Sequence, residues 1–172
     1  TINAGAGVIA LGNANDFTGA VTLSNSGANA ATLSNGANAL SLGSGTSVGN
    51  NLTLTSGALS LGTTTVGGNL SATTTGAITQ TGALAVTGTS NFSAGANAIT
   101  LNNTGNNFTG AVTLSNSGAN AATLSNGANA LSLGSGTSVG NNLTLTSGAL
   151  SLGMTTVGGN LSATTTGAIT QT

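Results

Sequence analysis

The chain has 172 residues, lacks Lys, Arg, His, Cys, Trp, Tyr and Pro, and carries a single acidic side chain, that of Asp16. A typical globular domain is about 25% charged, and a nucleic-acid binder needs Lys or Arg to displace phosphate counterions. Disulfides are impossible, and no apolar run approaches the roughly 18 residues of a membrane-spanning helix. We therefore expect no nucleic-acid partner and no membrane insertion.

Tandem duplication dominates the organisation of the chain. Residues 17–81 recur 91 positions later as residues 108–172, and the two copies differ only where Met154 replaces Thr63. The repeating unit, residues 17–107, therefore spans 91 positions. Periodicity on this scale indicates a repeat architecture.

Residues 1–16 are a diverged version of the segment before the second copy. A shift of 91 positions lays Val8 on Ile99 and Asp16 on Asn107. We interpret the chain as one continuous fragment of a longer repeat protein. It would contain the end of a preceding unit, one full unit and a partial second unit, which are residues 1–16, 17–107 and 108–172.

Several short segments have the residue pattern of β-strands. Apolar and polar residues alternate over residues 51–55, 58–61, 98–101 and 112–115, and Gly, Asn or Ser borders these runs. Helix is disfavoured because Gly, Ser, Thr and Asn are abundant and charged pairs at helical spacing are absent. The sequence therefore predicts an all-β chain of short strands.

A short motif, Asn followed by Leu or Phe and then Ser or Thr, returns along the chain. Together with Leu124, its apolar members form a first series: Leu52, Leu70, Phe92, Phe108, Leu124 and Leu143. A second series follows about seven positions behind and consists of Leu59, Ile78, Ile99, Leu114, Leu131 and Leu150. Both series close after five steps. We therefore predict five coils per unit, each of about 18 residues, which is the scale of solenoid repeats.

Antiparallel hairpins give no reason for one tripeptide to return at this interval, whereas stacked coils place it once in every turn. The spacing therefore predicts a right-handed parallel β-helix, or β-solenoid, over the whole chain. A sandwich or an up-and-down barrel is the alternative. One unit would rise about 24 Å. The two series are expected to point inward and to stack in the orders Leu52, Leu70, Phe92 and Leu59, Ile78, Ile99.

The repeated asparagine is the most informative polar residue. Stacked in register, side-chain amides can form a hydrogen-bonded ladder along the axis. The alternative is modification, because each of these asparagines begins an Asn-x-Ser/Thr glycosylation acceptor. The structural role in a turn or ladder is favoured for Asn51, Asn69, Asn91, Asn107, Asn142 and Asn160.

The chain contains almost none of the side chains that catalyse reactions. General acid–base catalysis uses His, Glu, Asp, Lys, Tyr or Cys, and Asp16 stands alone, with Asn107 at its place in the other copy. Ser and Thr nucleophiles have no base to activate them. Residues 67–69 contain the glycines of a calcium-binding coil without its Asp. We therefore expect no enzyme activity, no metal and no other cofactor.

Thr-rich segments suggest a second kind of function. Residues 53–55, 63–65 and 73–75 could form flat Thr ranks like those of ice-binding β-solenoids, although β-propensity also explains them. Equivalent positions elsewhere hold Ala, Gly or Ser, as in residues 93–95. Ice or glycan binding by a flat Thr/Asn face is therefore the alternative function.

Coils rich in Gly, Asn, Ser and Thr, such as residues 49–54 and 57–61, resemble the β-helical shafts of filamentous-haemagglutinin-like and autotransporter adhesins. The resemblance implies a bacterial protein that is exported and holds a binding tip away from the cell surface. No motif here matches the adhesive residues of those proteins. The lack of charge departs from typical shafts and favours side-by-side or end-to-end association.

These observations together predict a structural module of an extracellular or cell-surface protein that forms a stalk, fibre or sheath. Its expected partners are further repeats or other copies of the same chain. Adhesion to host or surface glycans is an additional expectation that follows from the resemblance alone.

Overall fold

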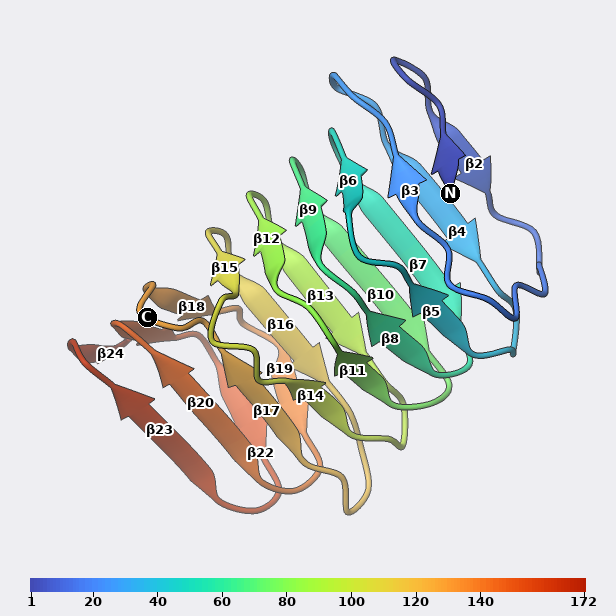
Figure 1. The fold of residues 1–172 in the computed structure, drawn as a ribbon. Coiled ribbons are helices and arrows are strands. Elements are labelled where there is room, and N and C mark those ends of the chain that lie inside the picture. Colours follow the sequence, from blue (N-terminus) through green and yellow to red (C-terminus); the bar gives the residue numbers. More distant parts are fainter.

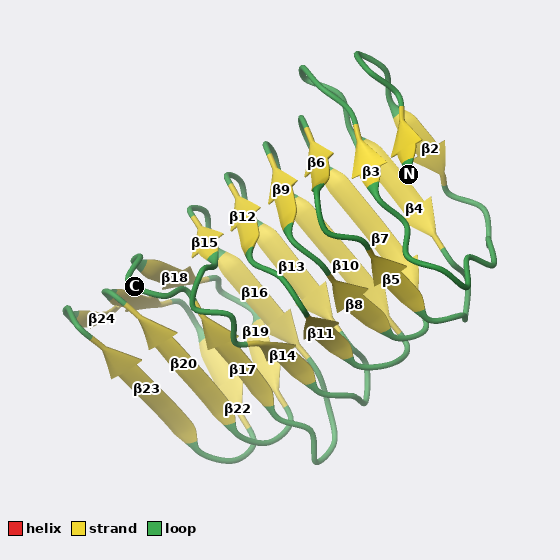
Figure 2. Ribbon diagram, viewed as in Figure 1, coloured by secondary structure: helices red, strands yellow, loops and turns green.

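The computed structural model describes residues 1–172 and consists of strands and turns without helices (Figures 1 and 2). Its 24 strands wind into about eight stacked turns, and every strand pairing is parallel. The N-terminus and the C-terminus lie at opposite ends of the stack. The prediction of an all-β parallel solenoid is confirmed.

Three faces run along the solenoid, and each complete turn after the first contributes one strand to each face (Figure 1). Face A contains β1 (Ile2–Asn3), β3 (Leu23–Ser24), β6 (Thr46–Val48), β9 (Thr64–Val66), β12 (Leu84–Val86), β15 (Asn107–Phe108), β18 (Leu131–Leu133), β21 (Leu150–Leu152) and β24 (Ile169–Gln171). Face B contains β2 (Ile9–Leu11), β4 (Ala31–Ser34), β7 (Leu52–Ser56), β10 (Leu70–Thr74), β13 (Ser90–Ser93), β16 (Val112–Ser115), β19 (Thr137–Val139) and β22 (Thr155–Val157). Face C contains β5 (Leu40–Leu42), β8 (Leu59–Leu61), β11 (Ile78–Gln80), β14 (Ile99–Leu101), β17 (Ala122–Ser125), β20 (Leu143–Ser147) and β23 (Leu161–Thr165).

Strand β16 bridges two faces. Its Val112 pairs with Leu133 of β18, while its Ser115 pairs with Ser138 of β19. Backbone pairing therefore links β18, β21 and β24 to the sheet of face B. The three strands themselves lie over face A, where Thr109, directly after β15, borders the same groove as β18 (Figure 1).

Strand alternation explains the core. In β7, Leu52, Leu54 and Ser56 are buried, whereas Thr53 and Thr55 are exposed, because successive side chains of a strand point to opposite sides. The same alternation in every turn builds one continuous core of 33 buried apolar residues. The core therefore runs along the axis of the solenoid.

All twelve residues of the two predicted apolar series are buried. Leu70 pairs with Leu52 as the predicted stack requires. The second series begins as predicted, since Ile78 pairs with Leu59 on one side and with Ile99 on the other.

The first series does not form a single stack. Phe92 pairs with Ala72, because Ser90 occupies the place next to Leu70. Phe108 pairs with Val86 on face A, so the prediction of one column for the whole series is wrong. The motif returns on all three faces because its middle residue points inward in any strand.

The second series also changes column after its third member. Leu114 pairs with Phe92 on face B, whereas Ile99 pairs with Ala122 on face C. Leu131 and Leu150 pair with each other on face A.

The turns are longer than the sequence predicts and vary in length. The stretch of chain from Ile99 to its partner Ala122 is longer than the stretch from Leu52 to its partner Leu70. The unit of residues 17–107 contains twelve complete strands, β3 to β14, and the segment at Phe17, the counterpart of β15. Thirteen strand positions at three per turn make four and one-third turns, not five.

The extra third of a turn moves the second copy by one face. The sequence Leu-Thr-Leu-Thr-Ser lies on face B as β7 and on face C as β20, where it pairs with β17 and β23. Likewise, β8 of face C reappears as β21 over face A. At about 4.8 Å per turn, a unit rises about 21 Å instead of the predicted 24 Å.

The segment before the first copy is one residue shorter than its counterpart. Ile9 pairs with Ala31 as Ile99 pairs with Ala122. Ile9 therefore occupies the core position to which a uniform shift assigned Val8, and Val8 is 64% exposed.

Candidate functional site

Outward hydroxyl and amide groups form two parallel ranks on face B. The first rank runs through Thr32, Thr53, Ser71, Asn91 and Thr113. The second runs through Ser34, Thr55, Thr73, Ser93 and Ser115. Members of a rank are about 4.8 Å apart. The two ranks are about 6.7 Å apart because their members lie at positions i and i+2 of each strand. The result is a regular polar grid over five turns.

Face C carries a single outward rank of hydroxyl groups. It runs through Ser41, Ser60, Thr79, Thr100, Thr123, Thr144 and Ser162. Thr53, Thr55 and Thr73 of the expected Thr-rich segments belong to the ranks of face B, whereas Thr64 and Thr74 are buried. The other members were not recognisable from the sequence because the turns vary in length. The alternation of Ser or Thr with apolar residues in each strand is the local signal that remains.

Two equivalent shallow grooves of about 250 Å³ each accompany these ranks. Ala39, Ala58 and Ala77 line the first groove together with Ser41 and Ser60 on face C. The second groove is lined by the residues 91 positions later and lies over face A. Small side chains in successive turns create both grooves, and neither contains a charged group.

Buried asparagines occupy the corners between strands. Asn126 is fully buried; its Oδ1 accepts the N–H of Phe108 at 2.8 Å, and its Nδ2 donates to the carbonyls of Phe108 and Ala130 at 3.2 and 2.6 Å. Asn35 makes the equivalent bonds to Phe17 and Ala39 in the first copy. Each side-chain amide thus pairs with the backbone of the preceding turn as a strand residue would.

Other corners use the same device. Asn116 accepts the N–H of Gly140 at 3.1 Å and donates to the carbonyls of Asn97 and Ala121. Asn106 exchanges two bonds with the side-chain amide of Gln80, at 2.9 and 3.0 Å. These residues were not predicted from the sequence, because Asn beside Gly or Ser in a turn is usually solvated. The Asn-Gly pair at residues 35–36, where Gly36 has φ +61°, was the available signal.

The six asparagines predicted to form a ladder lie at the surface. Asn51 Oδ1 accepts the backbone N–H of Asn69 at 2.8 Å, and Asn69 Oδ1 accepts that of Thr89 at 2.8 Å. Asn142 Oδ1 accepts the N–H of Asn160 in the same way. These contacts join a side chain to the backbone of the next turn instead of joining two side-chain amides.

The remaining two predicted ladder residues are separated from this arrangement. Asn91 points outward from β13 on face B, where it pairs with Ser71. Asn107 points outward from β15 on face A, beside Ala85. Neither side chain makes a hydrogen bond to the protein, so the structure does not bring the six asparagines into one column.

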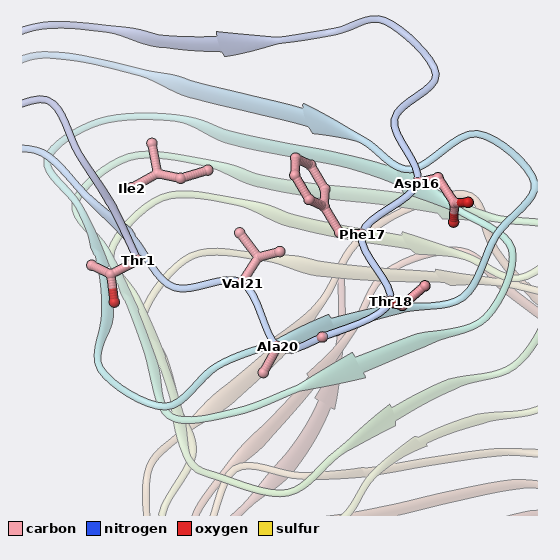
Figure 3. A pocket seen from close by; sticks show the side chains of 8 residues that line it. Thr1, Ile2, Asp16, Phe17, Thr18, Ala20 and Val21 are labelled. Carbon is pink, nitrogen blue, oxygen red and sulfur yellow. The ribbon is translucent and has the colours of Figure 1, made fainter.

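Asp16 lies at the N-terminal end of the solenoid (Figure 3). A cavity of about 350 Å³ opens there, and Thr1, Ile2, Phe17 and Val21 contribute to its lining. Figure 3 shows the side chains of Ile2, Phe17 and Val21 converging, while the carboxylate of Asp16 points away from them. This cavity is the uncovered interior of the first turn.

The C-terminal end is open in the same manner. A hollow of about 450 Å³ is bordered by residues that include Leu152, Val157 and Leu161. Nowhere in the structure do three His, Cys, Asp or Glu side chains come together. No helix is present that is long and apolar enough to cross a membrane.

The stacked turns and their polar outer ranks define a tandem-repeat β-solenoid. The chain belongs to the family described as Repeats of unknown function (DUF5649), which matches residues 1–24, 49–115 and 140–172. No curated protein and no solved structure matches the chain.

The family match divides each unit in a way that the fold explains. The matched residues 49–115 contain ten strands, β7 to β16, which make three and one-third turns. The unmatched residues 25–48 contain β4, β5 and β6, one strand for each face. This segment therefore adds a whole turn and leaves the rotation between successive family repeats unchanged.

Proposed function

We propose that the chain is a length of a non-enzymatic shaft in an extracellular or cell-surface bacterial protein, and that further repeats or copies of it extend the shaft into a stalk, fibre or sheath. The observation that carries this proposal is the junction between the two units. Phe92 of the first unit pairs with Leu114 of the second, and Ile99 pairs with Ala122. The ladder crosses the junction on faces B and C. On face A the strand pairing ends at β15, and Asn126 of the next turn accepts the N–H of Phe108 there at 2.8 Å.

A junction of this kind allows growth by simple duplication. Each turn contacts only its neighbours, so stability accumulates along the stack. A new unit pairs with the one before it through contacts that the protein already contains. The length of the shaft can therefore change without any redesign of its core.

The surface supports association and offers little to catalysis. Its outward groups are hydroxyls, amides and methyls, and Asp16 is the only ionisable side chain. Without like-charge repulsion between copies, side-by-side contact is electrostatically unopposed. A lone exposed carboxylate has no second group with which to divide acid and base roles.

The test varies the number of units. Variants that carry one, two or three additional copies of the unit after Asn107 are purified and measured by small-angle X-ray scattering and electron microscopy. We expect the particle to lengthen by about 21 Å per unit at constant width, with a repeat of about 4.8 Å along its axis. An increase in width without an increase in length would overturn the proposal.

Location requires its own experiment. Antibodies against the repeat should label intact cells of the producing organism as strongly as permeabilised cells. Labelling that requires permeabilisation would contradict a surface location and leave the shaft architecture to be judged by the length measurement.

A second candidate function is the binding of ice or glycans, and the double rank on face B favours it. Thr53, Thr55, Ser71 and Thr73 form the centre of a flat grid of outward groups. Thr53→Lys and Thr73→Lys would interrupt the grid at exposed positions without touching the core. Loss of ice-recrystallisation inhibition or of glycan-array binding in these variants would support the binding function. Absence of both activities in the unaltered protein would exclude that function.

A further inference from the structure

Most asparagines of this chain fall into two structural groups that follow the sequence around them. Seven begin an Asn-x-Ser/Thr triplet: Asn51, Asn69, Asn91, Asn102, Asn107, Asn142 and Asn160. We propose that these seven are acceptor sites for N-linked sugars and that the solenoid is a glycosylated shaft.

The division is visible in the hydrogen bonds of Nδ2, the atom that would carry the sugar. Twelve asparagines donate through Nδ2 to protein groups: Asn15, Asn25, Asn29, Asn35, Asn50, Asn97, Asn106, Asn116, Asn120, Asn126, Asn129 and Asn141. None of these twelve begins an acceptor triplet. All seven triplet asparagines are exposed, and none uses Nδ2 in a hydrogen bond to the protein.

Strand geometry places both essential residues of a triplet on the outside. Side chains two residues apart in a strand point to the same side, so Asn91 and Ser93 both face outward from β13 while Phe92 is buried. Asn107 and Thr109 flank the buried Phe108 in the same way. The acceptor amide and the hydroxyl that defines the site are therefore presented together.

Three of the acceptors are held in a defined orientation. The Oδ1 atoms of Asn51, Asn69 and Asn142 each accept a backbone N–H of the next turn at 2.8 Å. This bond engages the oxygen of the amide and leaves the nitrogen outside. A sugar on Nδ2 would therefore keep the interturn bond intact.

The transfer itself requires a glycosyl donor and a transferase. The donor is a sugar whose anomeric carbon is esterified to the phosphate of a nucleotide or lipid. A bond forms between Nδ2 and the anomeric carbon, the carbon–oxygen bond to the phosphate breaks, and the phosphate leaves with that electron pair. One amide proton passes to a base of the transferase. No oxidant or reductant takes part.

The positions of the acceptors match the needs of a chain without charge. Asn51, Asn69 and Asn91 lie along face B, Asn107 lies on face A, and Asn142 follows the rotation of the second copy to face C. Sugars at these positions would surround the shaft. They would supply the surface hydration that charged side chains normally provide.

The experiment is peptide mass spectrometry of the full-length protein isolated from the organism that produces it, with fragmentation that keeps the sugar on its side chain. Because the chain lacks Lys and Arg, digestion relies on proteases that cut beside Leu and Phe. We expect hexose or N-acetylhexosamine mass increments on the triplet asparagines and none on Asn35 or Asn126. Unmodified asparagine at all seven positions would overturn the proposal, as would sugar restricted to Ser and Thr.

A matched pair of variants tests the role of the hydroxyl. Thr109→Ala removes the triplet at Asn107 without altering the acceptor itself, whereas Thr109→Ser preserves the triplet. We expect sugar at Asn107 to fall to background in the first variant and to remain in the second, with Asn91 modified in both. Equal occupancy in the two variants would contradict the assignment. Neither result depends on whether the shaft forms fibres, so this proposal and that of a structural shaft fail independently.

Discussion

The rings of Phe92 and Phe108 meet edge to face inside the solenoid, with centroids 6.1 Å apart and planes at 83°. Phe92 comes from face B and Phe108 from face A of the following turn. Both side chains are fully buried. The pair joins two faces and two turns at the junction between the two units.

Truncation of either phenylalanine ring should lower the stability of the fold. Phe92→Ala or Phe108→Ala is expected to lower the free energy of unfolding by about 3–5 kcal/mol, because each leaves a cavity in a packed core. The double variant should show a coupling energy of about 0.5–1.5 kcal/mol in denaturant titrations. Phe17→Ala is the control, since Phe17 is only half-buried and should lose less. Strict additivity of the two core substitutions would contradict the edge-to-face contact.

The corner asparagines should be sensitive to loss of the amide. Asn126→Ala would leave the N–H of Phe108 without its partner at a buried position. A destabilisation of about 1–3 kcal/mol is expected. Asn38→Ala, at an exposed position of the first copy, should change stability little. Thermal unfolding followed by circular dichroism would compare the two, and equal effects would refute the proposed corner bonds.

Ser90 offers a stabilising substitution. Its Oγ is the single buried side-chain oxygen or nitrogen without a hydrogen-bond partner, and its neighbours in the column are Leu70 and Val112. Ser90→Ala should raise the free energy of unfolding by about 1 kcal/mol because it removes an unsatisfied polar group. Ser56→Ala should have the opposite effect, since Ser56 Oγ donates to the carbonyl of Ala58 at 3.1 Å. A loss of stability in Ser90→Ala would indicate an unseen partner.

Close approach of successive turns should make particular glycines irreplaceable. A Cβ at Gly57 would collide with the carbonyl oxygen of Ala37 in the turn before it. Gly57→Ala is expected to cost about 1–3 kcal/mol through forced backbone movement. At Gly19 a Cβ would have open space and an ordinary φ, so Gly19→Ala should be tolerated. Chemical denaturation of the two variants provides the measurement.

The fold class could be predicted from the sequence because two periods are readable there. Alternation within strands such as Leu52–Ser56 gives the inward and outward sides, and the duplication gives the repeat. The number of turns per unit could not be predicted in the same way. Loops such as residues 43–45 lengthen the chain between strands without adding a strand, so the spacing of apolar residues does not give the number of turns.

The predicted stacking of the first apolar series was lost where Ser90 enters the core. Ser90 sits at the place that a Leu occupies one turn earlier, and Phe92 fills the following inward position. The spacing of large apolar residues therefore misplaced Phe92 by one inward position. Met154 occupies a corner and is 74% exposed, and nothing in the structure explains its substitution for Thr63.

The polar surface was harder to anticipate than the core. Asn35 and Asn51 are the same residue type, yet the first is a buried corner residue and the second is exposed. The difference depends on which turn lies next to each, and stacking decides that. The hydrogen-bond pattern separates the asparagines that hold the turns together from those that face solvent, and the Asn-x-Ser/Thr triplets follow the same division.

Each unit makes four and one-third turns, and the extra third gives the solenoid a property that a unit with a whole number of turns would lack. Leu54 and Leu145 are the same residue of the repeat, yet they belong to different faces. Over three units each position of the repeat would occur once on each of the three faces, so the solenoid would have no single distinct side. A substitution that spreads by duplication would therefore appear on all three faces. If copies associate as proposed, neighbouring solenoids would pack around one another in bundles instead of aligning along one preferred side.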